Sequence, residues 1–89
     1  MRPCYGVQAQ SKDDVLLLEL SGEFGSEAAW DLFNLLALRD TGRGEIVIDT
    51  DAIDSVAPIG RAVFRNLLKL SMMPVDRMRF KGSQARFMV

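Results

Sequence analysis

The sequence contains no histidine and only one cysteine, and both scarcities limit its chemistry. Histidine is the commonest general base and a common ligand of transition metals, so catalytic Ser-His-Asp and Cys-His arrangements are excluded. The single Cys4 permits neither an internal disulfide bond nor a thiolate metal cluster. A glycine-rich phosphate loop is also absent, because the two glycines of TGRGE lead into a predicted strand instead of a helix. We therefore expect a protein that is not an enzyme and that has no cofactor or metal.

Long apolar runs and an excess of one charge are missing as well. No run approaches the ~18 apolar residues of a membrane-spanning helix. The stretch 1–14 lacks the apolar region of a secretory signal peptide. The net charge of −1 gives no bulk attraction to nucleic acid or to an acidic membrane. These absences predict a cytoplasmic protein with no nucleic-acid partner and no direct membrane insertion.

The residues that are present are those of a small globular protein. The chain has 89 residues, of which 48% are hydrophobic and 26% are charged. This length suits one domain, and the composition suits a packed core. We therefore predict a single domain over residues 1–89.

Alternating apolar residues in the N-terminal part predict strands at 4–10 and 15–20, joined by the polar turn 11–14 as an antiparallel hairpin. The side chains expected to face the core are Tyr5, Val7, Ala9, Leu16, Leu18 and Leu20. A helix is predicted over 27–40, with Ser26 as its cap. Its apolar stripe consists of Ala29, Leu32, Phe33 and Leu36.

The C-terminal part begins with an almost wholly apolar run at 45–50, which predicts a central strand. The segment 51–57, DAIDSVA, is predicted to be a loop, and Pro58 to begin a helix. The apolar stripe expected on this helix consists of Ile59, Val63, Leu67 and Leu70. A strand at 76–81, with Met78 and Phe80 inward, and a short helix from Ser83 complete the chain. The fold class is therefore α/β, a small mixed sheet in the order β-β-α-β-α-β-α, with parallel strands where a helix connects them.

Three carboxylates, Asp49, Asp51 and Asp54, fall within six residues at the end of the central strand. Converging carboxylates are typical of a magnesium or calcium site. The spacing fits no common metal loop, however, and the glycine of an EF-hand is absent. The alternative is an acidic loop whose aspartates accept hydrogen bonds from free backbone N–H groups. A receiver-type phosphorylated aspartate is disfavoured, because the first hairpin supplies only Asp13 and Asp14, in a turn.

Three further groups of side chains can belong either to an interface or to an ordinary surface or core. Three basic residues recur every four positions: Arg61, Arg65 and Lys69. They form either an ordinary solvated helix face or a basic ridge that docks an acidic partner. Trp30 and Leu38 lie off the main apolar stripe of the first helix. They either pack under a neighbouring loop or form an exposed apolar patch of the kind that marks interfaces. A third group can fill the core or form an adaptable contact surface, and with it a homodimer: Met72, Met73, Phe87 and Met88.

The segments VLLLELSGEF, EIVIDTDAI and APIGRAVFRNLL, in this order and spacing, resemble the STAS domain, the family of bacterial anti-sigma factor antagonists. The resemblance implies a STAS-like domain that acts in transcription regulation by binding an anti-sigma factor or another regulatory protein. It also implies that the segment after the third strand, together with the second helix, forms the docking surface. The implied partner-binding residues are Asp49, Thr50, Asp51, Asp54, Ser55, Ala57, Pro58, Ile59, Gly60, Arg61 and Arg65.

In many members of this family, a serine in an Asp-Ser-Ser-Gly-like segment at the helix start is phosphorylated and the complex separates. Alignment from Asp49 without gaps places that segment on 57–60, where Gly60 matches and Pro58 occupies the acceptor position. Ser55 is the nearest hydroxyl before the helix and is the candidate phosphorylation site. Arg61 is also a departure, because family members tend to carry small or apolar side chains there.

Three functions follow as expectations. The first is an anti-sigma factor antagonist-like regulator that binds its partner through the third-strand segment and the second helix. The second is a non-switching STAS-like subunit of a lipid or solute transporter complex, which the missing acceptor at Pro58 favours. The third is a small metal-dependent enzyme that uses Asp49 and Asp51, and it requires a bound divalent ion.

Overall fold

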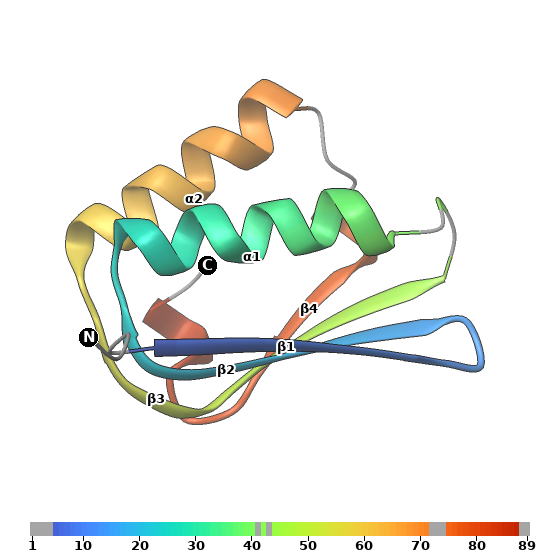
Figure 1. Ribbon diagram of the computed structural model, residues 1–89, viewed down its shortest axis with the longest axis horizontal. Coiled ribbons are helices and arrows are strands. Elements are labelled where there is room, and N and C mark those ends of the chain that lie inside the picture. Colours follow the sequence, from blue (N-terminus) through green and yellow to red (C-terminus); the bar gives the residue numbers. More distant parts are fainter. Residues whose placement is uncertain (1–4, 41, 43, 72–74, 88–89) are drawn as a thin grey trace.

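A four-stranded sheet with two helices forms the fold of the computed structural model, which describes residues 5–40, 42, 44–71 and 75–87 (Figure 1). The strands are β1 (Tyr5–Lys12), β2 (Val15–Phe24), β3 (Glu45–Val56) and β4 (Met78–Lys81). The helices are α1 (Ser26–Arg39) and α2 (Pro58–Ser71), and two short 3-10 turns span Val75–Arg77 and Ala85–Phe87. The predicted α/β class and element order are confirmed up to β4. The helix expected from Ser83 is only a 3-10 turn within the described residues.

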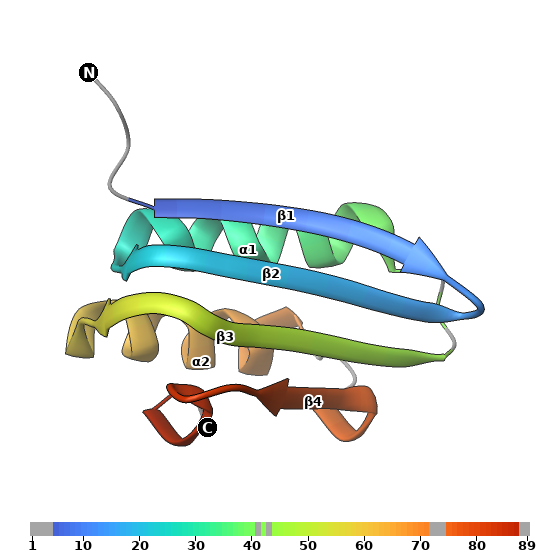
Figure 2. The same cartoon turned by 90° about the horizontal axis from the view of Figure 1, so that it is seen from below.

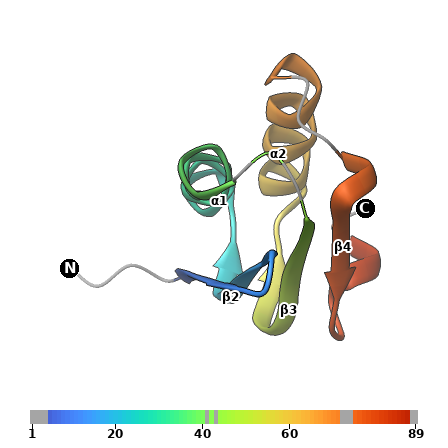
Figure 3. The same ribbon diagram turned by 90° about the vertical axis from the view of Figure 1, so that its right-hand side faces the viewer.

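The sheet is mixed, and its strand order is β1-β2-β3-β4. β1 pairs antiparallel with β2, whereas β2 with β3 and β3 with β4 are parallel pairs. Figures 2 and 3 show that α1 and α2 cover the same face of the sheet. The opposite face carries no helix among the described elements. Both parallel connections therefore cross on one side, and the molecule has two layers.

The core lies between the sheet and the two helices. The predicted inward residues of β2, Leu16, Leu18 and Leu20, are all buried. They pack in one cluster with Ile46 and Ile48 of β3. The same cluster contains Ala28, Ala29, Leu32, Leu36 and Phe64 from the helices. The predicted inward side chains of the two edge strands pack against it: Tyr5, Val7, Ala9, Met78 and Phe80.

The prediction of a loop at 51–57 is wrong, because β3 continues to Val56. β2 likewise continues to Phe24, and the pair stays in parallel register with shifts beside Ser21 and Gly22. Gly22 has a positive φ of 75°, a conformation that glycine adopts without strain, so the ladder can pass this irregularity. Polar residues such as Asp51 and Asp54 point to solvent from this strand, which is why their composition was typical of a loop.

The apolar stripe predicted for α2 is also partly wrong. Ile59 and Leu70 are 61% and 84% exposed, whereas Gly60 and Phe64 are the buried residues of the helix. The buried side is therefore turned by about one residue, or about 100°, from the predicted stripe. The missing side chain of Gly60 permits this orientation, because a Cβ there would lie 2.4 Å from the carbonyl oxygen of Phe24. In α1, Ser26 is the first helical residue instead of the cap, and Gly25 takes the cap position without a side-chain bond.

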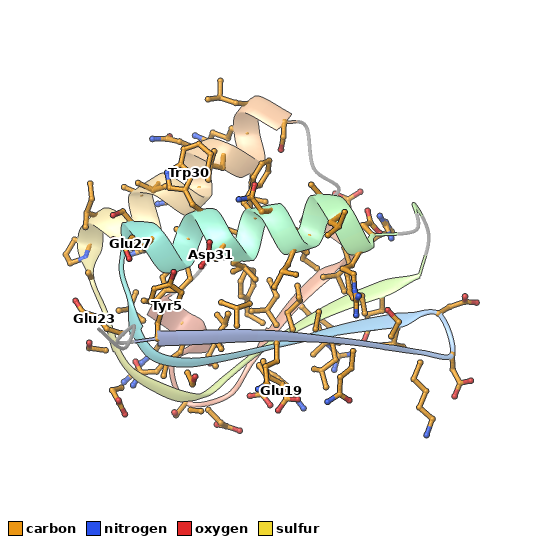
Figure 4. The ribbon with its side chains drawn as sticks, in the orientation of Figure 1. Tyr5, Glu19, Glu23, Glu27, Trp30 and Asp31 are labelled. Atoms are coloured by element: carbon orange, nitrogen blue, oxygen red, sulfur yellow. The ribbon has the colours of Figure 1, made fainter. Side chains whose placement is uncertain are left out.

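Tyr5 ties the edge strand β1 to α1, since its phenol donates a hydrogen bond to the carboxylate of Asp31 (Figure 4). This hydrogen bond, together with partial burial and the negative charges of Asp31 and Glu27, raises the pKa of Tyr5 to about 12 from its ordinary 10.0. The folded chain thus holds the phenolic proton more tightly than the unfolded chain does.

We predict that this contribution to stability is fully present below about pH 10 and is lost as the pH rises towards 12. Because Tyr5 is the only tyrosine, absorbance at 295 nm follows its ionisation directly. The Tyr5→Phe variant provides the control, since it removes the hydrogen bond and its pH dependence together. An absorbance midpoint near pH 10 in the folded protein would contradict the prediction.

Candidate functional site

The carboxylates of Asp49 and Asp51 contact backbone N–H groups and Lys81 instead of each other. Asp49 accepts a hydrogen bond from the N–H of Asp51 at 3.0 Å, and its other oxygen lies 3.8 Å from the Lys81 ammonium. Asp51 accepts a hydrogen bond from the N–H of Ser83 at 3.0 Å. The alternative in which aspartates satisfy free backbone N–H groups is thereby confirmed for these two residues. Across the described part of the chain, no three His, Cys, Asp or Glu side chains group as metal ligands would.

Thr50 is fully buried and joins β3 to the segment after β4. Its hydroxyl donates to the carbonyl oxygen of Lys81 at 2.7 Å and accepts from the N–H of Gln84 at 3.2 Å. Gly82 completes this joint, since a Cβ there would lie 2.6 Å from the Asp51 nitrogen and 2.8 Å from the Thr50 hydroxyl. Residues 49–51 therefore fix the segment 81–84 in place.

We predict that Thr50→Val lowers the free energy of unfolding by about 2 kcal/mol, because two partly buried backbone groups lose their hydroxyl partner while the side-chain volume is kept. Urea unfolding followed by circular dichroism measures this loss. Thr50→Ser keeps the hydroxyl and serves as the control, with a smaller expected cost of about 1 kcal/mol for the lost methyl group. Equal losses in both variants would mean that the hydroxyl is not what matters.

The start of α2 is held tightly against the end of β2. The N–H of Ala57 donates to the Phe24 carbonyl at 3.0 Å, and Pro58 follows as the first helical residue. The first turn of the helix closes with a bond from the N–H of Arg61 to the Ala57 carbonyl at 3.1 Å. Gly60 lies directly over the β2–α1 junction, where no larger side chain fits. The first turn of α2 is therefore a rigid platform for the side chains that it exposes.

A shallow cavity of about 350 Å³ opens beside this first turn. Pro58, Arg61 and Arg65, all predicted partner-binding residues, line it together with Val56 and Ala62. The sequence analysis missed Val56 because it ended the strand at residue 50. It missed Ala62 because an alanine carries no chemical signal of its own, although its position four residues after Pro58 and three before Arg65 places it on the same side of the helix.

The other predicted residues lie in different places. Ile59 is exposed on the side of α2 away from the cavity lining, and Gly60 is buried beneath the helix. Asp54 and Ser55 are exposed near the end of β3, where Ser55 pairs in register with Glu23 of β2. Residues 49–51 bind the C-terminal segment, as described above. The structure thus brings together three of the predicted residues around one cavity and separates the rest.

The lining of this cavity is both apolar and cationic. Its walls combine the apolar side chains of Val56, Pro58 and Ala62 with the guanidinium groups of Arg61 and Arg65. Arg65 and Lys69 are exposed on the same helix, and Lys69 extends the positive charge towards its C-terminus. Apolar contact beside arginine is typical of protein interfaces, and the positive charge favours an acidic partner.

Comparisons with known proteins identify the fold. No family model matches the sequence, and no curated protein matches it significantly. A crystal structure of a protein designated Mglu superposes with a TM-score of 0.71 at 17% identity, over 86% of this chain and 19% of that one. The crystal structure of an anti-sigma-factor antagonist STAS domain from Rhodobacter sphaeroides superposes with a TM-score of 0.59 at 15% identity, over 89% of this chain and 87% of that one.

These similarities show a STAS-like fold. The STAS domain from Rhodobacter sphaeroides matches along most of both chains, whereas this chain spans only about a fifth of the Mglu chain. None of the helices in the described residues has the length and apolar character that a membrane span requires.

Proposed function

We propose that this chain is a regulatory protein-binding module of the anti-sigma factor antagonist type, and that it docks its partner at the cavity beside the first turn of α2. The proposal treats residues 1–89 as one cytoplasmic domain that acts without catalysis, cofactor or nucleic acid. The partner is an anti-sigma factor or another regulatory protein that presents an acidic surface.

The observation that carries this proposal is the position of the cavity. Its lining comes from the end of β3 and the start of α2, the segments that the resemblance to STAS domains implies for docking. The lining residues are held by the rigid first turn of α2, so a partner meets a preformed surface and little ordering entropy is lost on binding. The fold shared with an anti-sigma-factor antagonist supports the same assignment.

Within this proposal, the partner contacts centre on Pro58, Arg61 and Arg65, whereas Asp49, Thr50 and Asp51 hold the segment 81–84. Asp54, Ser55, Ala57 and Ile59 form the surroundings of that centre. The buried Gly60 contributes by positioning α2 and makes no contact with the partner.

Ser55 is the proposed site of regulation by phosphorylation. It is exposed and sits one residue before Val56, which lines the cavity. A phosphate there adds negative charge close to Asp54 and close to Glu23, which pairs with Ser55 across the β2–β3 ladder. This charge repels an acidic partner, so phosphorylation releases the complex. Incorporation of phosphate elsewhere, or unchanged binding of Ser55→Asp, would contradict this part of the proposal.

The test of the docking site is a charge reversal on its rim. Arg65→Glu is expected to reduce the partner recovered by affinity capture from the native lysate by about tenfold, because a charge-assisted contact becomes a repulsion. Lys12→Glu is the matched control, since Lys12 is an exposed cation at the β1–β2 turn on another part of the molecule. Equal recovery by wild type and Arg65→Glu would refute the docking site.

The transporter-subunit alternative rests on Pro58, which occupies the family acceptor position and begins α2 in this structure. It is distinguished by the identity of the captured proteins. Recovery of a sigma-factor regulator supports the first function, and recovery of transporter components supports the alternative.

A further inference from the structure

The helical layer exposes an apolar strip on the side away from the sheet. Among the described residues, four large hydrophobic side chains are exposed: Trp30 (50%), Leu38 (79%), Ile59 (61%) and Leu70 (84%). All four belong to α1 or α2, and none belongs to the uncovered face of the sheet. Figure 4 shows Trp30 on α1 directed away from the sheet, while Glu19 points from the opposite face.

The apolar residues of α2 border α1. Ile59, Val63 and Leu70 share one side of α2, because helix positions four and seven residues apart nearly align. Val63 packs against the core cluster to which α1 contributes Leu32 and Leu36, and α1 and α2 lie side by side over the sheet, so we infer that this side faces the neighbouring helix. Figure 3 shows α2 rising farther from the sheet than α1 does. The apolar side of α2 therefore forms a step above the outer surface of α1.

Opposite charges flank this step. Glu27 and Asp31 lie on the far edge of α1, where Asp31 accepts the hydrogen bond of Tyr5 from the edge strand β1. Arg65 and Lys69 lie about 120° around α2 from its apolar side. Leu38 lies beside Asp31 on this acidic edge, since both border one hollow with Val7 of β1, so the apolar strip between the edges consists of Trp30, Ile59, Val63 and Leu70. Across the helical layer, the order is thus the acidic edge, this strip and a basic edge.

We propose that this surface binds a second copy of the chain. A twofold axis parallel to the helices turns the layer over, so that the basic edge of each copy faces the acidic edge of the other and the two strips meet. The raised α2 of each copy then fits above α1 of its partner, and four helices form the interface. This arrangement is isologous, with every contact made twice. The charge pattern is complementary to itself, which selects a second copy over a partner of uniform charge.

The dimer does not depend on the proposed function, and it is measured on the purified chain alone. Because Arg65 belongs to both surfaces, dimer formation competes with docking of the regulatory partner. A failed dimer leaves the docking proposal intact, and a failed docking site leaves the dimer intact.

Sedimentation equilibrium over a range of protein concentrations tests the proposal. Wild type is expected to be a concentration-dependent dimer. Two double variants each give both edges of the chain the same charge: Glu27→Lys/Asp31→Lys and Arg65→Glu/Lys69→Glu. In a homodimer of either variant, like charges therefore meet, and dimerisation is expected to weaken by about tenfold or more. Mixing the two variants restores complementary edges, and a heterodimer is expected. A monomeric wild type at all concentrations, or a mixture that stays monomeric while wild type dimerises, would overturn the proposal.

Two further variants distinguish loss of the dimer interface from loss of the fold. Leu70→Glu changes a side chain that is already 84% exposed, so the fold remains and only the dimer is expected to dissociate. Lys12→Glu/Arg79→Glu reverses two exposed charges outside the helical layer and is expected to leave the dimer unchanged. The single tryptophan, Trp30, provides a second signal, since its emission shifts to shorter wavelength when the strip is covered. An unshifted emission at concentrations where wild type is dimeric would place the interface elsewhere.

Discussion

Phe64→Ala is expected to lower the free energy of unfolding by about 4 kcal/mol, the largest effect of any single substitution considered for this fold. Phe64 is 1% exposed and is the main side chain by which α2 enters the core. Its ring makes edge-to-face contacts with Phe24 of β2, at a centroid distance of 6.0 Å, and with Phe80 of β4, at 6.4 Å. Truncation therefore removes both aromatic pairs and leaves a cavity between three elements.

This loss is large for a domain of this size, whose total stability is typically about 5–10 kcal/mol. Urea unfolding followed by circular dichroism measures this loss of unfolding free energy. In hydrogen exchange, the amides of β4 are expected to lose protection first, because β4 is the short edge strand. Phe64→Leu is the matched control, because it keeps most of the buried area and should cost about 1–2 kcal/mol. A loss below about 1 kcal/mol for Phe64→Ala would mean that α2 is not anchored through this ring.

Gly60→Ala is expected to destabilise the fold by about 3 kcal/mol, although alanine is the better helix former by about 1 kcal/mol. The reason is the close approach of α2 to the β2–α1 junction. A Cβ on Gly60 would lie 2.4 Å from the Phe24 carbonyl oxygen and 2.8 Å from backbone atoms of Gly25. These are backbone atoms, which cannot rotate away as a side chain can, so the helix itself has to shift.

The control is Ala62→Gly on the exposed side of the same turn, where propensity alone acts and the expected loss is about 1 kcal/mol. Thermal unfolding of both variants compares the two effects. If Gly60→Ala raises the melting temperature, helix propensity dominates and the close packing of α2 is not required. Because Gly60 positions Arg61 and Arg65, its substitution is also expected to weaken partner docking without touching a contact residue.

The hairpin and the sheet class could be predicted from the sequence because their signal is local. Leu16, Leu18 and Leu20 alternate with less buried residues, and alternation directly reports which face of a strand is covered. The apolar run from Ile46 to Ile48 likewise predicts a central strand. These elements carry their burial pattern within a few residues, so no tertiary information is needed.

The length of β3 and the orientation of α2 could not be predicted, because each depends on a distant segment. β3 extends through residues 51–56, where Ile53 is buried, since β2 continues beside it past the irregularity at Gly22. α2 turns Gly60 inward because the β2–α1 junction lies beneath it, whereas the sequence alone shows only a small residue of low helix propensity. The apolar stripe of α2 is real, but its two ends, Ile59 and Leu70, are exposed, whereas Val63 packs against the core.

Only part of the candidate site could be predicted, because only part of it depends on local spacing along the chain. Pro58, Arg61 and Arg65 share one helix, so their proximity follows from helical spacing. The role of Thr50 required knowledge that the segment after β4 returns to β3, where Lys81 and Gln84 bond to its hydroxyl. No pattern in the sequence links these residues across about thirty positions. The sequence placed residues 49–51 among the partner-binding residues, and the structure shows in addition that they hold the segment 81–84.

The most direct test of the account is site-specific photo-crosslinking in the native lysate, with a benzoyl-phenylalanine placed at Ala62 on the cavity wall. The account predicts that Ala62 crosslinks to one regulatory protein, and that Arg65→Glu in the same chain abolishes the product. A crosslinker at Gln10, exposed on the first strand far from α2, is expected to yield no such product. Capture of the same protein from Gln10, or a product at Ala62 that Arg65→Glu leaves unchanged, would contradict the claim that the first turn of α2 is where this protein binds its partner.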